Sequence, residues 1–175
     1  MKKVLKQILV GVIVTLVMVL TTGTLIKVNR KKTLNSRIET FPAFEFKALN
    51  DSSFSSDQIR EGPVVIMFFN PECEHCQYQI SALIEKPEIF STSLLLLVSN
   101  ADKNSIREFA GANKLSELDG IKILVDDGYR FIDYFGTESV PTTFIYDSHL
   151  KLVRYFQGEV LPETILKYIL QDGQY

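Results

Sequence analysis

The sequence has few of the side chains that bind transition metals. Its 175 residues include two cysteines, Cys73 and Cys76, and two histidines, His75 and His149. A structural zinc site takes four ligands, most of them Cys or His, and His75 lies between the two cysteines in the chain. We therefore expect no metal site, and the cysteine pair needs another explanation.

The C-terminal part of the chain lacks a surplus of basic residues. Residues 1–40 hold eight basic residues and one acidic residue, which leaves 11 basic and 20 acidic residues in 41–175. Proteins that bind nucleic acid draw most of their affinity from Lys and Arg at the phosphates. Nucleic acid is therefore excluded as a partner. The sequence also contains no internal repeat and no low-complexity tract.

Charged residues are missing from residues 7–26, QILVGVIVTLVMVLTTGTLI. A helix of this length spans about 30 Å, which matches the hydrocarbon core of a bilayer. We expect residues 1–27 to be an N-terminal transmembrane anchor that is not cleaved, since no A-x-A-like cleavage site follows it. A cleaved signal peptide and a buried helix of a globular domain are the alternatives. Basic residues flank both ends, so the positive-inside rule does not decide the orientation.

The rest of the chain is expected to form a basic linker, 28–40, and one folded domain, 41–175. Apolar and alternating runs predict strands at 42–47, 64–69, 94–98, 121–125, 142–146 and 150–156, the last two joined as a hairpin. Helical spacing predicts a turn at 57–60, a helix from the cysteines to near Pro87, and helices at 104–113, 128–135 and 162–170. We expect Phe131, Ile132 and Phe135 to share one face. This alternation predicts an α/β fold with a mixed central sheet flanked by helices on both faces.

The two cysteines lie where a buried strand gives way to a helix. At the start of that helix, unpaired backbone N–H groups and the positive end of the helix dipole favour the thiolate of Cys73. Cys76 follows one helical turn later and can close a small, easily reopened disulfide with Cys73. A disulfide that closes so short a loop would add little stability. The pair is therefore interpreted as a redox switch in which Cys73 is the nucleophile.

Three titratable residues flank the cysteines. As a cation or a donor, His75 would stabilise the Cys73 thiolate and make the couple more oxidising. Glu72 and Glu74 oppose this, because a carboxylate disfavours a nearby anion. We expect both carboxylates to be solvated and screened, so that the stabilising groups narrowly prevail and the redox potential is intermediate. A merely solvated helix end is the alternative for these three side chains.

From about Phe41 to Gln171 the sequence resembles the TlpA/ResA-like thiol-disulfide oxidoreductases of the thioredoxin superfamily. The matching blocks are FPAF at 41–44, CEHC at 73–76 after a strand, and VPTTFIYD at 140–147 with Gly158 beyond. The resemblance implies a thioredoxin-like fold, with Cys73 and Cys76 as the catalytic pair and a cis bond before Pro141. It also implies that the backbone of Val140 pairs with an extended substrate segment.

The sequence departs from these relatives at three positions. Met67 stands where thioredoxin has a buried Asp, and Gln79 stands where ResA-like proteins have a Glu. Glu72 replaces the aromatic residue that usually precedes the first cysteine. Proton transfer to and from Cys76 must therefore use water, Glu74 or a group that the sequence does not identify.

These features predict an enzyme, a thiol-disulfide oxidoreductase that exchanges electrons with the thiols and disulfides of partner proteins and needs no small-molecule cofactor. We expect the domain to face the extracytoplasmic side of a bacterial cytoplasmic membrane, where protein disulfides persist. The single span 7–26 would hold it there. The relatives that the sequence resembles usually act as reductants, so we expect a reductase, and its electron donor is left open.

Three other functions share the fold. A DsbA-like oxidant would use the same cysteine pair in the opposite direction, and its C-P-H-C motif resembles residues 73–76. A thiol peroxidase requires a Thr or Ser three residues before the cysteine, where this chain has Asn70. A Sco-like copper chaperone uses cysteines four apart and a distant His. Here the spacing is three, and His149 is expected in a hairpin turn that faces away from the cysteines.

Overall fold

The computed structural model describes residues 7, 11–24, 37–59 and 62–171. Contacts divide the chain into two compact units, Met1–Ser36 and Arg37–Tyr175. In the first unit, residues 11–24 are helical. Threonine hydroxyls of this helix donate to carbonyl oxygens one turn earlier, Thr15 to Gly11 at 3.1 Å and Thr21 to Val17 at 2.9 Å. The polar groups of these side chains are thereby satisfied within the helix itself.

The expected membrane anchor falls only partly on described residues. Within the part of the chain that the structure describes, no helix combines the length and the apolar character of a membrane span. Residues 8–10 and 25–26 of the expected span lie outside the described residues, as do 28–36 of the expected linker. The anchor therefore stays a prediction.

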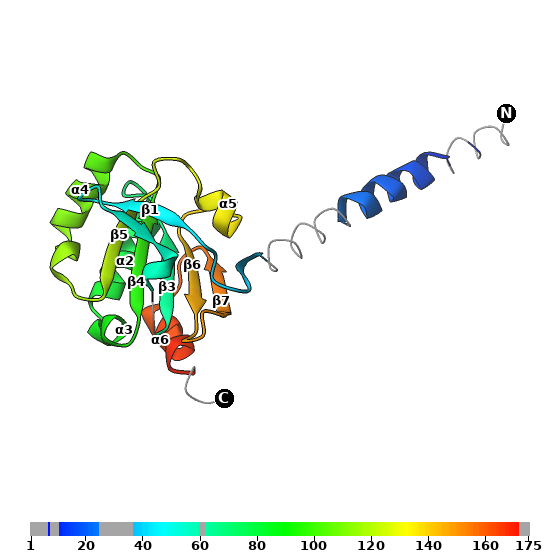
Figure 1. Cartoon of the computed structure of the whole chain (residues 1–175). Coiled ribbons are helices and arrows are strands. Elements are labelled where there is room, and N and C mark those ends of the chain that lie inside the picture. Colours follow the sequence, from blue (N-terminus) through cyan, green and yellow to red (C-terminus); the bar gives the residue numbers. More distant parts are fainter. Residues whose placement is uncertain (1–6, 8–10, 25–36, 60–61, 172–175) are drawn as a thin grey trace. The chain divides into compact units, whose positions relative to one another are not determined.

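The second unit contains a seven-stranded mixed sheet with the order β2-β1-β5-β4-β3-β6-β7 (Figure 1). The strands are β1 (Glu45–Ala48), β2 (Ser53–Ser55), β3 (Val64–Phe68), β4 (Leu94–Ser99), β5 (Ile121–Val125), β6 (Thr142–Tyr146) and β7 (Leu152–Gln157). The central strands β3, β4 and β5 run parallel, whereas the outer pairs are antiparallel. The carboxyl ends of β3, β4 and β5 consequently lie at one edge of the sheet.

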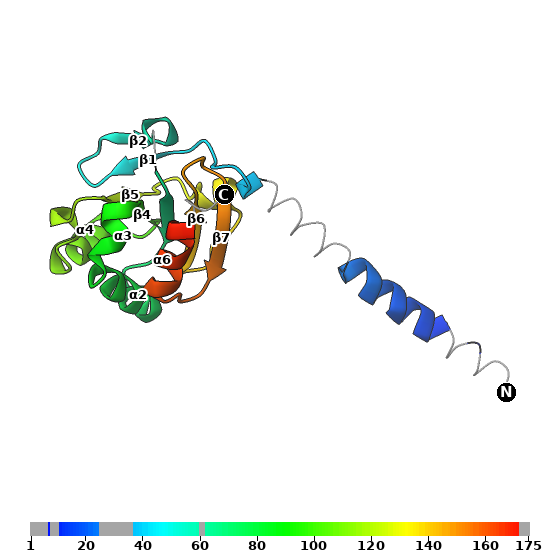
Figure 2. The same cartoon turned by 90° about the horizontal axis from the view of Figure 1, so that it is seen from below.

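Helices connect the parallel strands and cover the sheet. They are α2 (Glu74–Ile84), α3 (Pro87–Thr92), α4 (Lys103–Ala112), α5 (Phe131–Phe135) and α6 (Pro162–Leu170), with the short 3₁₀ turns η1 (Ser56–Gln58) and η2 (Leu115–Glu117). Figure 2 shows α2, α3 and α6 gathered on one side of the sheet. On that side they share one apolar cluster with the β-strand residues Val65 and Met67. The expected mixed sheet flanked by helices is confirmed.

Strand β3 is buried on both faces, as its unbroken apolar sequence predicts. The residues that alternate with Val65 and Met67 point to the opposite face, which is aromatic. There the Phe68 and Phe131 rings stack with their centroids 4.2 Å apart, and Phe131 and Phe135 stack at 4.4 Å. Helix α5 therefore covers the face opposite to α2, and β3 lies buried between the two layers.

Four features of the second unit differ from the expectations. Ile132 is 38% exposed, because a five-residue helix turns it away from the face that buries Phe131 and Phe135. Strand β2 and helix α3 were not expected; β2 has three residues, too few to show a period, and α3 begins at Pro87, which occupies the first turn. The compact unit also starts earlier than Phe41, since Ile38 is fully buried.

Candidate active site

A short turn carries the chain from β3 into α2. The side-chain oxygen of Asn70 accepts a hydrogen bond from the backbone N–H of Glu72 at 2.8 Å. The carbonyl oxygen of Asn70 accepts from the N–H of Cys73 at 3.1 Å. An Asn followed by a Pro supports such a turn, because the Asn side chain bonds to the backbone two residues on. The turn delivers Cys73 to the start of the helix, at the carboxyl edge of the sheet.

Cys73 is the N-cap of α2. Its backbone is extended, with φ −85° and ψ 113°, and its Sγ accepts a hydrogen bond from the N–H of Cys76 at 3.3 Å. A first-turn N–H without an intrahelical partner thus points at the sulfur, as the sequence predicted. Cys73 is partly exposed, and both cysteines are free thiols. The sulfur that caps the helix is therefore the one that a partner protein can reach.

Cys76 lies behind Cys73 and is fully buried. Burial raises the pKa of the Cys76 thiol to about 12, and its hydrogen bond with Cys73 adds to this effect. The two thiols are consequently unequal. Cys76 stays protonated at neutral pH, whereas Cys73 has the exposure and the N–H donor of a nucleophile.

The three titratable residues around the cysteines are exposed, and the side chain of His75 contacts a carboxylate. Glu72 and Glu74 are exposed at the start of α2. The Nδ1 atom of His75 contacts the carboxylate of Glu159, which belongs to the loop between β7 and α6. Glu159 was missed in the sequence, because 84 residues separate it from His75 and no local pattern marks it.

Val140 and Pro141 lie at the same edge of the sheet as the cysteines. The bond between them is cis, as the resemblance implied. Pro141 comes directly before β6, and β6 pairs antiparallel with β3 so that Thr142 is opposite Phe68. This register places Pro141 beside the end of β3 that leads to Cys73. The carbonyl oxygen of Pro141 accepts a hydrogen bond from Gly158 N at 2.8 Å.

Gln79 is buried at the position where ResA-like proteins carry a Glu. Its Nε2 donates to the Thr143 hydroxyl at 2.9 Å, and its Oε1 accepts from the backbone N–H of Val160 at 3.2 Å. Both ends of the amide are therefore satisfied, and the side chain ties α2 to β6 and to the β7–α6 loop. Met67, at the other position of a family carboxylate, is fully buried. Neither side chain can accept a proton from Cys76.

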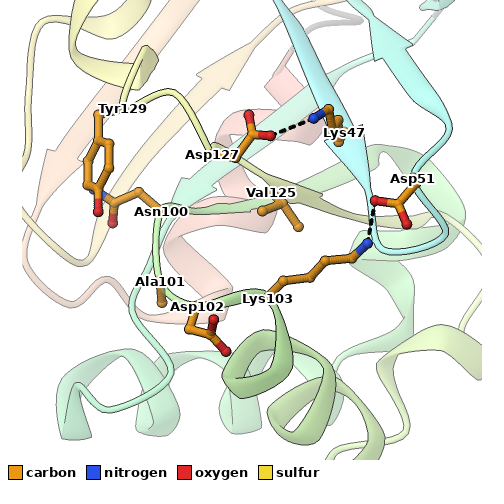
Figure 3. A pocket seen from close by; sticks show the side chains of 9 residues that line it. All are labelled: Lys47, Asp51, Asn100, Ala101, Asp102, Lys103, Val125, Asp127 and Tyr129. Atoms are coloured by element: carbon orange, nitrogen blue, oxygen red, sulfur yellow. Dashed lines mark hydrogen bonds and ion pairs between the residues drawn. The ribbon is translucent and has the colours of Figure 1, made fainter.

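A hollow of about 440 Å³ lies along the same sheet edge, near the ends of β4 and β5 (Figure 3). Lys47 pairs with Asp127 at 2.6 Å across it, and Lys103 pairs with Asp51. Hydrogen bonds from these lysines lower the pKa of both Asp51 and Asp127. The charges that line this hollow are therefore largely matched by one another.

The copper-chaperone and thiol-peroxidase alternatives depend on His149 and Asn70, and the structure shows where these two residues lie. His149 lies in the turn between β6 and β7, beyond Tyr146, and Tyr146 pairs with Val64 at the start of β3. It is thus at the opposite end of β3 from Cys73. Among the described residues, no group of three or more His, Cys, Asp or Glu side chains could hold a metal ion. Asn70 uses its side-chain oxygen in the turn and offers no hydroxyl for a peroxide.

Solved structures share this fold. A secreted disulfide oxidoreductase from Mycobacterium tuberculosis, homologous to E. coli DsbE, is 16% identical, with 78% of this chain and 98% of that chain covered at a TM-score of 0.62. A DsbF homologue from Corynebacterium diphtheriae is 19% identical, with 75% and 85% covered at 0.64. An exposed lipoprotein thioredoxin from Streptococcus pneumoniae is 20% identical, with 74% and 98% covered at 0.59. These similarities confirm the thioredoxin-like fold.

A comparison with curated proteins found no match. The model of the AhpC/TSA family matches residues 38–155, which is more than half of the 175 residues. The matched range contains Cys73, Cys76 and Pro141. Together with the Dsb-type structures of the same fold, it supports the enzyme class expected from the sequence, a thiol-disulfide oxidoreductase. The chain belongs to the AhpC/TSA family.

Proposed function

We propose that this protein is a thiol-disulfide oxidoreductase that exchanges electrons with partner proteins through Cys73 and Cys76. The observation that carries this proposal is the unequal pair at the start of α2. The partly exposed Cys73 sulfur accepts the N–H of Cys76, while Cys76 is buried and protonated. An accessible attacking sulfur and a sheltered resolving thiol are what two-step disulfide exchange requires.

The exchange proceeds in two displacements. The Cys73 thiolate attacks one sulfur of a partner disulfide, forms a mixed disulfide and releases the other partner sulfur as a thiolate. Cys76 then loses its proton and attacks the Cys73 sulfur. The Cys73–Cys76 disulfide forms, and the second partner sulfur leaves. Two electrons pass from the enzyme dithiol to the partner disulfide, so no small-molecule cofactor takes part. The oxidised enzyme must be reduced again by a separate dithiol.

The partner would be recognised beside the cysteines. Val140 is partly exposed and precedes Pro141, which lies at the cysteine edge of the sheet. An extended partner segment could therefore pair with the backbone of Val140 while its sulfur meets Cys73. The substrates in this proposal are proteins with exposed disulfides in flexible segments.

We further propose that the domain is held on the extracytoplasmic side of a bacterial membrane by residues 7–26, and that it acts as a reductase. In the described part of this segment, Thr22 and Thr24 also donate to carbonyl oxygens one turn earlier, which suits a helix in lipid. One protein of the same fold is described as secreted and another as an exposed lipoprotein. Protein disulfides that need reduction are found in such compartments.

Alkylation trapping of the full chain tests the chemistry. The protein is quenched with acid and unfolded before alkylation, so that the buried Cys76 is accessible too. After oxidation neither thiol should react with a maleimide reagent of high mass, and after treatment with dithiothreitol both should react. Variants Cys73→Ser and Cys76→Ser serve as matched controls, since each retains one thiol that cannot form the internal bond. If the two thiols of the unaltered protein never form a mutual disulfide, the proposal fails.

Orientation and direction need separate measurements. Protease added to intact spheroplasts should digest the domain, and full protection would contradict an extracytoplasmic location. Partners trapped as mixed disulfides by Cys76→Ser should accumulate in oxidised form in cells that lack the protein. Their accumulation in reduced form would instead make the protein an oxidant.

A further inference from the structure

The proposed exchange requires an acceptor for the proton of Cys76. This thiol must be deprotonated before it attacks the mixed disulfide, yet burial and the contact with Cys73 raise its pKa to about 12. The positions that hold a carboxylate in the relatives hold Met67 and the fully bonded Gln79. The acceptor is therefore water or a carboxylate at another position; Glu74, the candidate from the sequence, is exposed at the start of α2.

The loop between β7 and α6 crosses the face of α2 that carries Cys76. Gly158 N donates to the carbonyl oxygen of Pro141 at 2.8 Å, and Val160 N donates to Gln79 Oε1 at 3.2 Å. Both backbone neighbours of Glu159 are thereby anchored at the active site. Gln79 lies three residues after Cys76 and is buried like it, so the two side chains occupy the same face of the helix.

The carboxylate of Glu159 reaches the first turn of α2. It contacts the Nδ1 atom of His75, the residue that directly precedes Cys76. Its side chain is 38% exposed, which leaves it in contact with solvent. The negative charge of Glu159 also contributes to the raised pKa of Cys76, after burial and the contact with Cys73. Two backbone anchors and one side-chain contact thus hold a carboxylate at the start of α2, where its charge acts on the resolving thiol.

We propose that Glu159 accepts the proton of Cys76 as this thiol attacks the mixed disulfide, and that the contact with His75 holds the carboxylate in place. The inference rests on the proposed oxidoreductase function. The S–H bond of Cys76 breaks, an O–H bond forms on Glu159, and the sulfur electron pair makes the bond to Cys73. Glu159 then returns the proton to solvent, or back to Cys76 when the enzyme is reduced again.

Charge balance favours this route. A thiolate at the buried Cys76 sulfur would be opposed by the negative charge of Glu159, which already raises the pKa of this thiol. Moving the proton from the thiol to the carboxylate keeps one negative charge in total, and the neutral carboxyl group no longer repels the new thiolate. Before the attack, the charge of Glu159 therefore favours the protonated form of Cys76. Once the proton has moved, Glu159 is neutral and no longer disfavours the Cys76 thiolate.

The test follows the two steps separately. The reduced full chain is mixed with oxidised glutathione, quenched with acid at short times and weighed by mass spectrometry. The glutathione adduct on Cys73 reports the first step, and the internal disulfide reports the second. In Glu159→Gln we expect the first step at the rate of the unaltered protein, and a second step slower by on the order of 100-fold, so that the adduct accumulates.

Two further variants make the result specific. Glu159→Asp keeps a carboxylate and should recover much of the second-step rate, which a merely structural loss in the loop would not show. Glu163→Gln removes a carboxylate four residues along, where it pairs with Lys86 at 3.0 Å; it should leave both steps unchanged.

Adduct resolution by Glu159→Gln at the rate of the unaltered protein would overturn the inference. So would equal slowing by Glu163→Gln. An unaltered protein that forms the adduct but no internal disulfide would instead reject the proposed function itself.

Discussion

Helices α2 and α4 begin at the same edge of the sheet but are capped in different ways. They follow the neighbouring parallel strands β3 and β4. Asp102 caps α4, and its carboxylate accepts the N–H groups of Asn104 at 2.8 Å and Ser105 at 3.3 Å. Cys73 caps α2, and its sulfur accepts the single N–H of Cys76 at 3.3 Å.

The cap of α4 contributes to stability, whereas the cap of α2 contributes to reactivity. A carboxylate is a strong acceptor and stabilises the first turn of a helix, whereas thiol sulfur is a weak acceptor. The start of α4 is thus satisfied by its cap, and the hollow beside it is lined by paired charges. At α2 part of that stabilisation is given up, so that N–H groups and the helix dipole remain available to a thiolate. Substitutions at the two helix starts should therefore separate loss of stability from loss of exchange.

The largest effect should come from Cys73→Ser. Serine retains a helix cap, so the free energy of unfolding of the reduced protein should change by less than about 1 kcal/mol. The hydroxyl cannot form a disulfide, and exchange with oxidised glutathione should disappear. Thermal unfolding and the glutathione reaction measure the two quantities. Residual exchange through Cys76 alone would show that the buried thiol is reachable.

Alkaline pH should destabilise the reduced protein specifically. The folded state raises the pKa of Cys76 from its ordinary value of 9.0 to about 12, chiefly through burial. The folded protein therefore holds this proton more tightly than the unfolded chain does. The resulting stabilisation is complete below pH 9 and is lost as the pH rises toward 12. Urea unfolding of the unaltered protein and of Cys76→Ala, both reduced, measures it: only the unaltered protein should show this component, and parallel pH profiles would refute it.

Asp102→Ala should affect stability and leave the chemistry intact. Loss of the cap on α4 should lower the free energy of unfolding by about 1 kcal/mol. Asp102→Ser, which keeps a capping oxygen, should lose less. The rate of exchange with glutathione should be unchanged in both variants, because α4 carries no reacting group. A slower exchange would mean that the two helix starts are coupled.

The smallest effect is expected for His75→Ala. His75 should stabilise the Cys73 thiolate from an exposed position, so its loss should make the couple more reducing, by about two- to fivefold in the equilibrium with glutathione. Glu74→Gln should move the equilibrium in the opposite direction. If the equilibrium is unchanged in His75→Ala, His75 does not tune the redox potential and its role is limited to the contact with Glu159.

The sequence predicted most elements of the folded domain because their patterns are local. The apolar runs that became β3, β4 and β6 are long enough to show burial, and β5 has the bounds that were expected. The sequence also predicted that Cys73 lies at the start of a helix, because a strand pattern ends in a turn directly before the two cysteines. Elements without a period, such as the three residues of β2, left no such pattern.

By itself, the sequence determined the chemistry at the start of α2, since a nucleophilic sulfur and a second thiol one turn later depend on spacing along the chain. The tertiary structure decided what surrounds them. The contact of Glu159 with His75 joins residues 84 apart, and the Gln79 amide joins α2 to Thr143 and Val160. Such contacts depend on the order of the strands and on the path of the β7–α6 loop. Neither the strand order nor the path of this loop can be predicted from patterns in neighbouring residues.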